Sequence, residues 1–222
     1  MFTTLITPEE VQKNLEKDDW FIVDCRFDLA DTEVGRKAYR AAHIPGAIYV
    51  HLDEDLCGPP ITDHGRHPLP LPEIMAEHFG QMGIDAQTQV VAYDDKNGAF
   101  ASRLWWMLRY MGHQTAAVLD GGWQAWLEEG YPVRSGVEEK ASVEFSGEAQ
   151  KELLVTLDEV PSLPLLVDSR APERYRGEVE PIDPVAGHIP GAVNFFYQKN
   201  WDSENRYLPA KVLREQFEEL LG

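Results

Sequence analysis

Two different sequence motifs each occur twice in this chain, at nearly the same separation. The apolar run Phe21–Arg26 ends in Asp-Cys-Arg, and the apolar run Leu165–Arg170 ends in Asp-Ser-Arg. Residues 42–48 read Ala-His-Ile-Pro-Gly-Ala-Ile, and residues 187–193 read Gly-His-Ile-Pro-Gly-Ala-Val. The aspartates are 144 residues apart and the histidines 145. Two unrelated motifs that share one offset indicate a duplicated folding unit.

The first copy alternates between helical and extended patterns. Thr7 is a typical N-cap residue and Pro8 suits the first helical position, which predicts a helix to about Glu16. Further strands are predicted at residues 21–24, 43–50, 89–93 and 116–119, and further helices at residues 71–82, 99–111 and 123–129. Short apolar strands separated by helices predict an α/β fold with a parallel sheet covered on both faces.

The repeat divides the chain into three predicted segments. These are a first domain at residues 1–134, a polar linker at 135–150 and the first part of a second domain at 151–222. In the second domain, residues 155–160 repeat the opening helix with Thr156 as its cap. The second copy lacks a counterpart of the strand at 89–93 and of everything after it. We therefore expect a second domain that is truncated or incompletely described, since its sheet would keep unpaired edges.

Composition excludes several functional classes. Asp and Glu number 38 against 20 Lys and Arg, for a net charge of −18, and no basic stripe is present. Binding to nucleic acid or to an anionic membrane is therefore not expected. The N-terminus does not resemble a secretory signal, and no apolar run is long enough to span a bilayer. Cys25 and Cys57 lack metal-binding spacing, so we expect a cytoplasmic protein without a metal or cofactor.

The ordered set of motifs resembles the rhodanese superfamily. Besides the repeated motifs, the resemblance rests on Tyr93-Asp94, on Gly98, on Ser102-Arg103 and on the run Val118–Trp123. It covers nearly the whole chain. It implies a rhodanese-like three-layer α/β/α fold with a mainly parallel sheet, present as one complete copy and part of a second.

The resemblance to the two-domain thiosulfate and 3-mercaptopyruvate sulfurtransferases implies a chemistry. In that family a cysteine after the central strand of the C-terminal domain takes sulfane sulfur from a small anionic donor. The resulting persulfide passes the sulfur to a thiol or to cyanide. Asp94 stands at the matching position of the first copy, which implies a silent loop. In the second copy the matching position would fall about eleven residues beyond Gly222.

Three further residues match functional positions of the family. Arg174, in an Arg-Tyr-x-Gly segment, matches a substrate-binding arginine, and a guanidinium suits the carboxylate or sulfonate of a donor. The alternative is an exposed arginine in a charged loop. His67 and Asp53 match residues that assist proton transfer in mercaptopyruvate-type members. The alternative for His67 is a structural histidine in a loop.

The repeated polar residues favour structural roles. His43 and His188 precede Ile-Pro-Gly in both copies, including the silent one, which indicates that they fix the backbone. The aspartate and arginine that end each repeated strand are interpreted as ion-pairing or capping groups.

The leading hypothesis is a sulfurtransferase whose longer parent protein carries the nucleophilic cysteine, so the 222-residue chain itself is expected to be inactive. The alternative is a non-catalytic rhodanese-like module that binds or regulates. A phosphatase of related fold has no support in the first copy. The sequence leaves the donor, the acceptor and the oligomeric state open.

Overall fold

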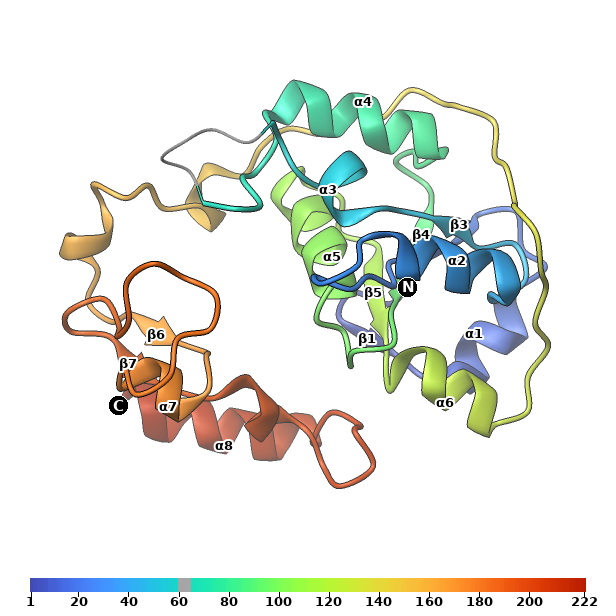
Figure 1. Cartoon of the computed structure of the whole chain (residues 1–222). Helices are drawn as coiled ribbons and strands as arrows, with labels where there is room; N and C mark the ends of the chain where they lie inside the picture. The colour runs from blue at the N-terminus through green and yellow to red at the C-terminus, as the bar shows by residue number, and fades with distance from the viewer. Residues whose placement is uncertain (60–64) are drawn as a thin grey trace. The chain divides into compact units, whose positions relative to one another are not determined.

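Strand β4 (Gln89–Tyr93) lies at the centre of a five-stranded sheet, and all five of its residues are buried. The strand order is β1-β5-β4-β2-β3, and every pairing is parallel (Figure 1). The computed structural model describes residues 1–59 and 65–222. It divides the chain into two compact units, Met1–Leu154 and Val155–Gly222.

The sheet belongs to the first unit. Its other strands are β1 (Leu5–Ile6), β2 (Trp20–Asp24), β3 (Ile48–Tyr49) and β5 (Ala116–Leu119), and its helices are α1 (Pro8–Asn14), α2 (Glu33–Ala41), α3 (Leu52–Asp55), α4 (Pro72–Met82), α5 (Ala101–Tyr110), α6 (Gly122–Glu128) and the 3-10 turn η1 (Lys151–Leu153). Among the described helices, none has the length and apolar character needed to cross a membrane.

Side chains of the sheet alternate between two hydrophobic clusters. Val90 and Ala92 of β4 point into the cluster that α4 and α5 cover. Val91 and Tyr93 point into the other cluster, to which α1 contributes Val11. Because successive side chains of a strand face opposite sides of a sheet, a strand buried on both faces must be apolar throughout. The predicted three-layer α/β/α arrangement with a parallel sheet is confirmed.

Local signals place several helix ends correctly. The hydroxyl of Thr7 accepts a hydrogen bond from the Glu10 N–H at 3.3 Å and caps α1. Helix α4 ends at Gly83, which has a φ of 94° and adopts the left-handed conformation that glycine tolerates. The predictions missed α2, which is polar overall and of which only Gly35 and Tyr39 are buried.

The segment predicted as a linker packs onto the first unit. The ring of Phe145 is buried and lies 5.2 Å from that of Phe79 in α4. The Val143 N–H donates to the Gly80 carbonyl at 2.9 Å, and the Gln150 N–H donates to the Tyr110 carbonyl at 2.7 Å. Residues 135–150 are therefore bound along α4 and α5 through their backbone, although their composition is polar.

The second unit has a much smaller core. It contains η2 (Val160–Ser162), β6 (Val167–Asp168), α7 (Pro172–Tyr175), β7 (Val193–Asn194), η3 (Tyr197–Asn200) and α8 (Ala210–Leu221). Strands β6 and β7 form a parallel pair. Among the described residues of this unit, only Ala192 and Phe195 are buried hydrophobic residues.

The predicted helix at residues 155–160 is wrong. The Thr156 hydroxyl and N–H both donate to Glu159 Oε2 at 2.7 Å, but none of the described backbone N–H groups donates to the Thr156 hydroxyl as it would at a helix N-cap. The segment leads only into the 3-10 turn η2. Pro161 lacks an N–H and disfavours the α conformation at the preceding residue, Val160. The predicted cap at Thr156 and the helix after it are therefore both absent from this segment.

A buried polar network joins the carboxyl ends of β2 and β4. The Arg26 guanidinium donates to Asp24 through Nε at 3.0 Å and to the Ala42 carbonyl through Nη2 at 2.6 Å. The Tyr93 hydroxyl donates to Asp24 Oδ2 at 2.6 Å, and the Trp123 ring centre lies 4.4 Å from the guanidinium. Burial raises the pKa of Asp24. The structural role predicted for the aspartate and arginine is confirmed in the first copy.

We predict that Tyr93→Phe destabilises the first unit. The substitution removes the hydroxyl that donates to Asp24 and accepts from the Ile44 N–H, so the buried Asp24 carboxylate loses one of its hydrogen bonds and the Ile44 N–H loses its acceptor. The expected loss in the free energy of unfolding is about 1–3 kcal/mol, measured by urea denaturation. Tyr131→Phe, at a half-buried tyrosine that packs on Trp126, is the control and should change little. Equal effects of the two substitutions would contradict the role of the network.

Candidate functional site

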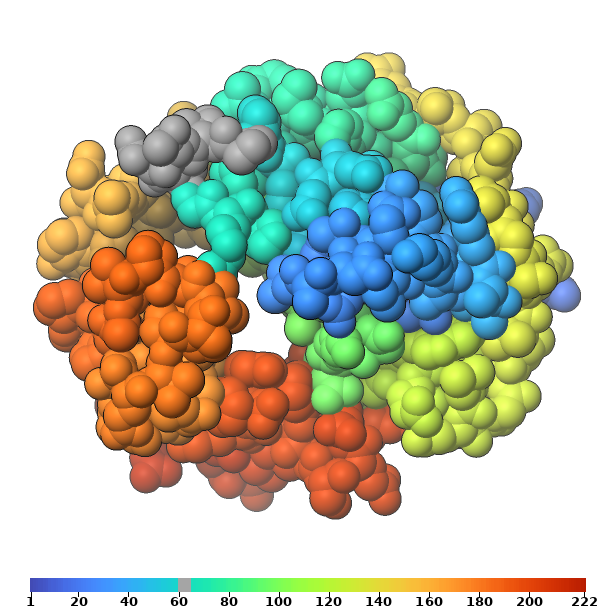
Figure 2. Space-filling view, viewed as in Figure 1, coloured from blue at the N-terminus to red at the C-terminus, as the bar shows by residue number. Residues whose placement is uncertain are grey.

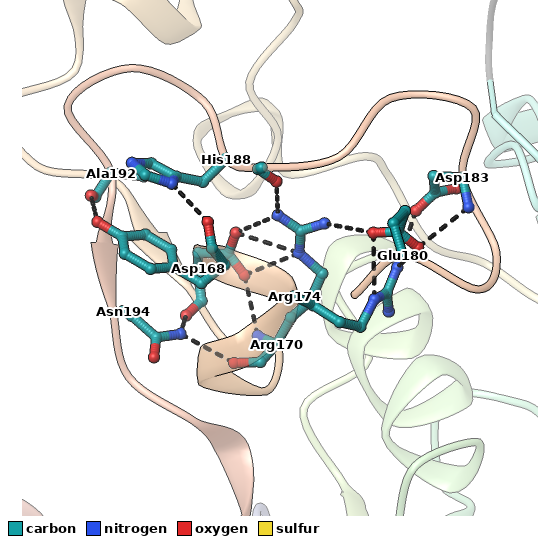
Figure 3. Close-up of polar contacts among 10 residues, drawn as sticks. Asp168, Arg170, Arg174, Glu180, Asp183, His188, Ala192 and Asn194 are labelled. Atoms are coloured by element: carbon teal, nitrogen blue, oxygen red, sulfur yellow. Dashed lines mark hydrogen bonds and ion pairs between the residues drawn. The ribbon is translucent and has the colours of Figure 1, made fainter. Parts of the chain in front are cut away.

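The second unit repeats the Asp-Arg network in a more open setting (Figure 3). The Arg170 guanidinium donates to Asp168 Oδ1 at 3.0 Å and to the Gly187 carbonyl at 2.7 Å. The side chains of Asp168 and Arg170 are 11% and 30% exposed, against 0% and 4% for Asp24 and Arg26. Hydrogen bonding from Arg170 lowers the pKa of Asp168, whereas burial raises that of Asp24. The same ion pair is therefore solvated in the second unit.

A tyrosine and a histidine form the same turn clamp in both units. His43 Nδ1–H donates to the Tyr39 carbonyl at 2.8 Å, and the two rings stack with their centres 4.3 Å apart. His188 Nδ1–H donates to the Tyr175 carbonyl at 2.7 Å, and these rings stack at 3.7 Å. Each tyrosine hydroxyl donates to the carbonyl of the alanine that follows Pro-Gly. The backbone-fixing role predicted for both histidines is confirmed.

Arg174 lies in α7 and is held by two carboxylates. It donates to Glu180 through Nη2 at 2.7 Å and through Nε at 3.2 Å, and to Asp183 through Nη2 at 2.9 Å (Figure 3). Hydrogen bonding from Arg174 lowers the pKa of Glu180 from 4.5 to about 2. The remaining nitrogen, Nη1, has no hydrogen bond to a described residue, and 20% of the side chain is exposed. Arg174 is therefore fixed in place while one edge of its guanidinium stays available.

A hollow of about 540 Å³ opens beside this cluster, within the second unit. Residues 166–170 line it, together with residues of the loop before β7 that include Asp183, Val185 and Ile189. This loop lies at the surface of the unit, in orange in Figure 2. Val185 is 77% exposed and Ile189 is 50% exposed. Because Asp183 both lines the hollow and pairs with Arg174, the guanidinium lies next to an apolar recess that a small organic anion could enter.

The structure brings His67 and Asp53 together in the first unit. His67 Nε2 lies 3.2 Å from Asp53 Oδ1, and both side chains are partly exposed. Burial lowers the pKa of His67, while Asp53 acts in the opposite direction. The Arg103 guanidinium in α5 donates to the carbonyls of Leu56, His67 and Pro68 at 2.9–3.2 Å. Arg103 therefore holds both ends of the loop that carries the histidine.

Asp94 directly follows β4, and its carboxylate is fully buried. Oδ1 accepts the N–H groups of Lys96 and Gly98, each at 2.8 Å. Oδ2 accepts those of Phe100 at 2.7 Å and Ala101 at 2.8 Å, at the N-terminus of α5. A carboxylate cannot form a persulfide. The loop after β4 is therefore closed around the Asp94 side chain and contains no nucleophile at this position.

Neither cysteine has the surroundings of a reactive thiol. Cys25 and Cys57 are both free and buried. Burial raises the pKa of both thiols, and that of Cys25 by the larger extent. A reactive cysteine needs the opposite shift. Cys57 begins a loop whose residues 60–64 lie outside the described residues.

One group in the described part of the chain brings three metal-ligand side chains together, namely Glu33, His51 and Glu54. Both ring nitrogens of His51 are already engaged, Nδ1 by the Glu54 N–H at 3.3 Å and Nε2 by the Thr32 carbonyl at 3.1 Å. The Arg36 guanidinium pairs with both glutamates. The negative charge of the group is therefore compensated by arginine, and the histidine has no free lone pair for a metal ion.

Sequence reasoning missed two components of these sites. Tyr39 precedes its histidine by four residues, whereas Tyr175 precedes its histidine by thirteen, so the pair does not share the offset of the repeated motifs. The signal that could have found it is an aromatic residue in the helix before each His-Ile-Pro-Gly segment. The sequence does not distinguish Glu180 as a partner of Arg174, because acidic residues are abundant around it.

Comparison with known proteins identifies relatives of the whole chain. The family profile of the rhodanese-like domain matches residues 7–129. A Pseudomonas aeruginosa protein named as a probable 3-mercaptopyruvate sulfurtransferase is 40% identical, over 98% of this chain and 79% of its own length. The thiosulfate sulfurtransferase of Bos taurus is 33% identical, over 89% of this chain and 69% of its own.

A solved structure shows the same fold. The 3-mercaptopyruvate sulfurtransferase from Leishmania major superposes with a TM-score of 0.85 at 28% identity. The match covers 97% of this chain, and the chain spans 61% of the length of that protein. The predicted fold class, a rhodanese-like α/β fold with a mainly parallel sheet, is confirmed.

We predict that His67 titrates below 6.5 and that Asp53→Asn lowers its pKa further. Burial already disfavours the imidazolium, and the Asp53 carboxylate is the group that supports it. A histidine whose pKa is lower in the folded than in the unfolded state stabilises the fold fully above the unfolded-state pKa near 6.5. This stabilisation is lost as the pH falls from 6.5 through the folded-state pKa. NMR titration of the His67 ring protons measures both values. Asp31→Asn, at an exposed acid elsewhere in the unit, is the control. An unchanged pKa in Asp53→Asn would rule out the pairing.

Proposed function

Because the chain belongs to the rhodanese family, we propose that it forms part of a tandem-domain sulfurtransferase. This enzyme moves sulfane sulfur from thiosulfate or 3-mercaptopyruvate to a thiophilic acceptor such as cyanide or a thiol. The names of the relatives support this function, and they do not favour a non-catalytic binding module. The two buried free thiols suit a reducing compartment, so we place the protein in the cytoplasm.

The roles that we propose for the two domains rest on Asp94 and on the two cysteines. The first unit has a carboxylate at the position of the nucleophile, and burial raises the pKa of both thiols of the chain. We therefore propose that residues 1–134 form a silent domain and that the nucleophile is a cysteine outside these 222 residues, in the second domain. Its thiolate would attack the donor sulfur and carry it as a persulfide.

Arg174 is the residue that we propose to bind the donor. The observation that carries this role is its geometry: Glu180 holds two nitrogens of the guanidinium, while Nη1 remains without a hydrogen bond among the described residues. A planar, fixed guanidinium suits a carboxylate or sulfonate. The Asp183 carboxylate also binds this guanidinium, and the Asp183 side chain is 39% exposed. An anionic donor would therefore displace Asp183 while Glu180 keeps Arg174 in place.

The His67–Asp53 pair bears on the choice of donor. Transfer from 3-mercaptopyruvate leaves an enolate that must take up a proton, whereas thiosulfate releases sulfite and needs no such proton. A histidine held by a carboxylate, with a pKa below 6.5, can relay a proton near neutral pH. We propose that this pair assists proton transfer to the departing pyruvate, which favours 3-mercaptopyruvate as donor.

The coding sequence and an activity assay test the proposed function together. We expect a cysteine codon about eleven residues after Gly222, because Asp94 follows Gly83, the corresponding helix end of the first copy, by eleven residues. We also expect the protein that contains it to form thiocyanate from cyanide and either donor, and the 222-residue chain to form none. A different residue at that position, or turnover by the pure 222-residue chain, would refute the proposal.

In the longer protein, Arg174→Gln is expected to raise KM for both donors by about 10- to 100-fold, as for the loss of one charged hydrogen-bonding partner. Arg176→Gln is the matched control. Arg176 lies two residues away, is 53% exposed and pairs only with the exposed Glu178 among the described residues. Steady-state kinetics with thiosulfate and with 3-mercaptopyruvate measure both variants. Equal KM values in the two variants would exclude Arg174 from donor binding.

A further inference from the structure

A short extended segment covers the tyrosine–histidine clamp of the first unit. The His43 N–H donates to the Arg134 carbonyl at 2.8 Å, and the Arg134 N–H donates to the His43 carbonyl at 2.9 Å, which makes an antiparallel bridge. The Glu138 N–H donates to the Tyr39 hydroxyl at 2.8 Å. Residues 134–138 therefore form a strap that binds the clamp mainly through its backbone.

The strap also places a carboxylate beside the histidine ring. Glu138 Oε1 accepts the Gly46 N–H at 3.4 Å and lies 3.7 Å from His43 Nε2. That ring nitrogen is buried and has no hydrogen bond to a described residue. The strap thus combines two features, a residue that pairs with the backbone of the histidine and, four residues later, a carboxylate that faces its ring.

The clamp of the second unit has the same geometry but no strap. The His188 ring is stacked on Tyr175 and bonded to its carbonyl (Figure 3), yet His188 is exposed, whereas His43 is fully buried. Within residues 1–59 and 65–222, no hydrogen bond is made by the N–H or the carbonyl of His188, or by the Gly191 N–H. The groups that bind the strap in the first unit are therefore present in the second and have no partner among the described residues.

The exposed clamp adjoins the proposed donor site. Tyr175 directly follows Arg174 in α7, a helix of only four residues, and His188 also lines the hollow beside that arginine. So short a helix is not stable by itself, and its position depends on tertiary contacts. A segment bound to the clamp would therefore fix the helical turn that carries Arg174.

We infer that the clamp of the second unit binds an extended segment, which carries a carboxylate four residues after the residue that pairs with His188. The longer protein supplies this segment itself, after the last helix of its second domain. In the first copy, Arg134 follows Glu128, the last residue of α6, by six residues. A segment tethered this closely has a high effective concentration, which favours it over a separate partner. Only this intramolecular source rests on the proposed function.

A second copy of the strap, appended to the 222-residue chain, tests the docking. Residues 132–140 are fused after Gly222 through about 20 Gly and Ser residues, a linker with a root-mean-square span of about 25 Å. The matched control has Glu138→Gln in the appended copy alone. A second control carries the same nine residues in scrambled order.

Amide hydrogen exchange, followed by NMR, measures whether the appended strap binds. We expect exchange of the His188 N–H to slow by at least about fivefold, because this group becomes hydrogen-bonded and covered. The His43 N–H, which is already covered, should not change. The Glu138→Gln control should slow exchange less, since a neutral amide accepts a weaker hydrogen bond than a carboxylate. Unchanged exchange at His188, or equal slowing by the scrambled segment or by the Gln control, overturns the inference.

The longer protein tests the source of the segment. Its His188 N–H should exchange as slowly as its His43 N–H without any appended strap. Rapid exchange at His188 in that protein would overturn the intramolecular source. Neither exchange experiment depends on sulfur transfer, so these results are separate from a failure of the proposed function.

Discussion

The buried ion pair between Asp24 and Arg26 is the interaction on which the first unit depends. A single carboxylate at the end of β2 receives the guanidinium of Arg26 and the hydroxyl of Tyr93 in β4. The guanidinium also binds the carbonyl of Ala42, and its face lies on the ring of Trp123 in α6. Charges this deeply buried are tolerated only when their hydrogen-bonding groups are satisfied, so the network specifies one arrangement of four segments.

The second unit contains the same pair with part of its surroundings missing. Arg170 binds Asp168 and the Gly187 carbonyl as in the first copy, and the tyrosine–histidine clamp is repeated. No tyrosine hydroxyl of the described residues reaches Asp168, however, and the carboxylate is partly solvated. The pKa of Asp168 therefore falls, through its hydrogen bonds to Arg170, while that of the buried Asp24 rises. The pKa of the aspartate in this repeated motif is thus shifted in opposite directions, because the motif is buried in the first unit and partly solvated in the second.

Carboxylates of the chain are held in two different ways in the two units. In the first unit, backbone N–H groups hold the Asp94 carboxylate, and this arrangement depends on the path of the loop. In the second unit, the Arg174 side chain binds Glu180 and Asp183, and its Nη1 makes no hydrogen bond within the part of the chain that the structure describes. A backbone site is selective for a small, embedded group, whereas a guanidinium at the surface suits a ligand that arrives from solvent.

The sequence by itself determined the parallel sheet and the identity of most strands, and its repeated motifs predicted a duplication. A strand buried on both faces must be a short apolar run, and such a run is readable without knowledge of its neighbours. It also placed the cap at Thr7 and the helix end at Gly83, because these depend on local backbone conformation. The pairing of His67 with Asp53 was available only through the family resemblance.

Only the tertiary structure decided the remaining features. The segment 135–150 reads as a linker, yet its backbone N–H groups bind carbonyls of α4 and α5 that no local pattern reveals. Residues 155–160 have the sequence of a capped helix but form none, since Pro161 follows and little core is present to pack against. Tyr39 and Tyr175 share a role at different sequence spacings, and Arg174 meets Glu180 across a loop. Three-dimensional contacts fix these features, whether between distant segments, as for residues 135–150, or across a short loop, as for Arg174 and Glu180. Composition and periodicity do not encode such contacts.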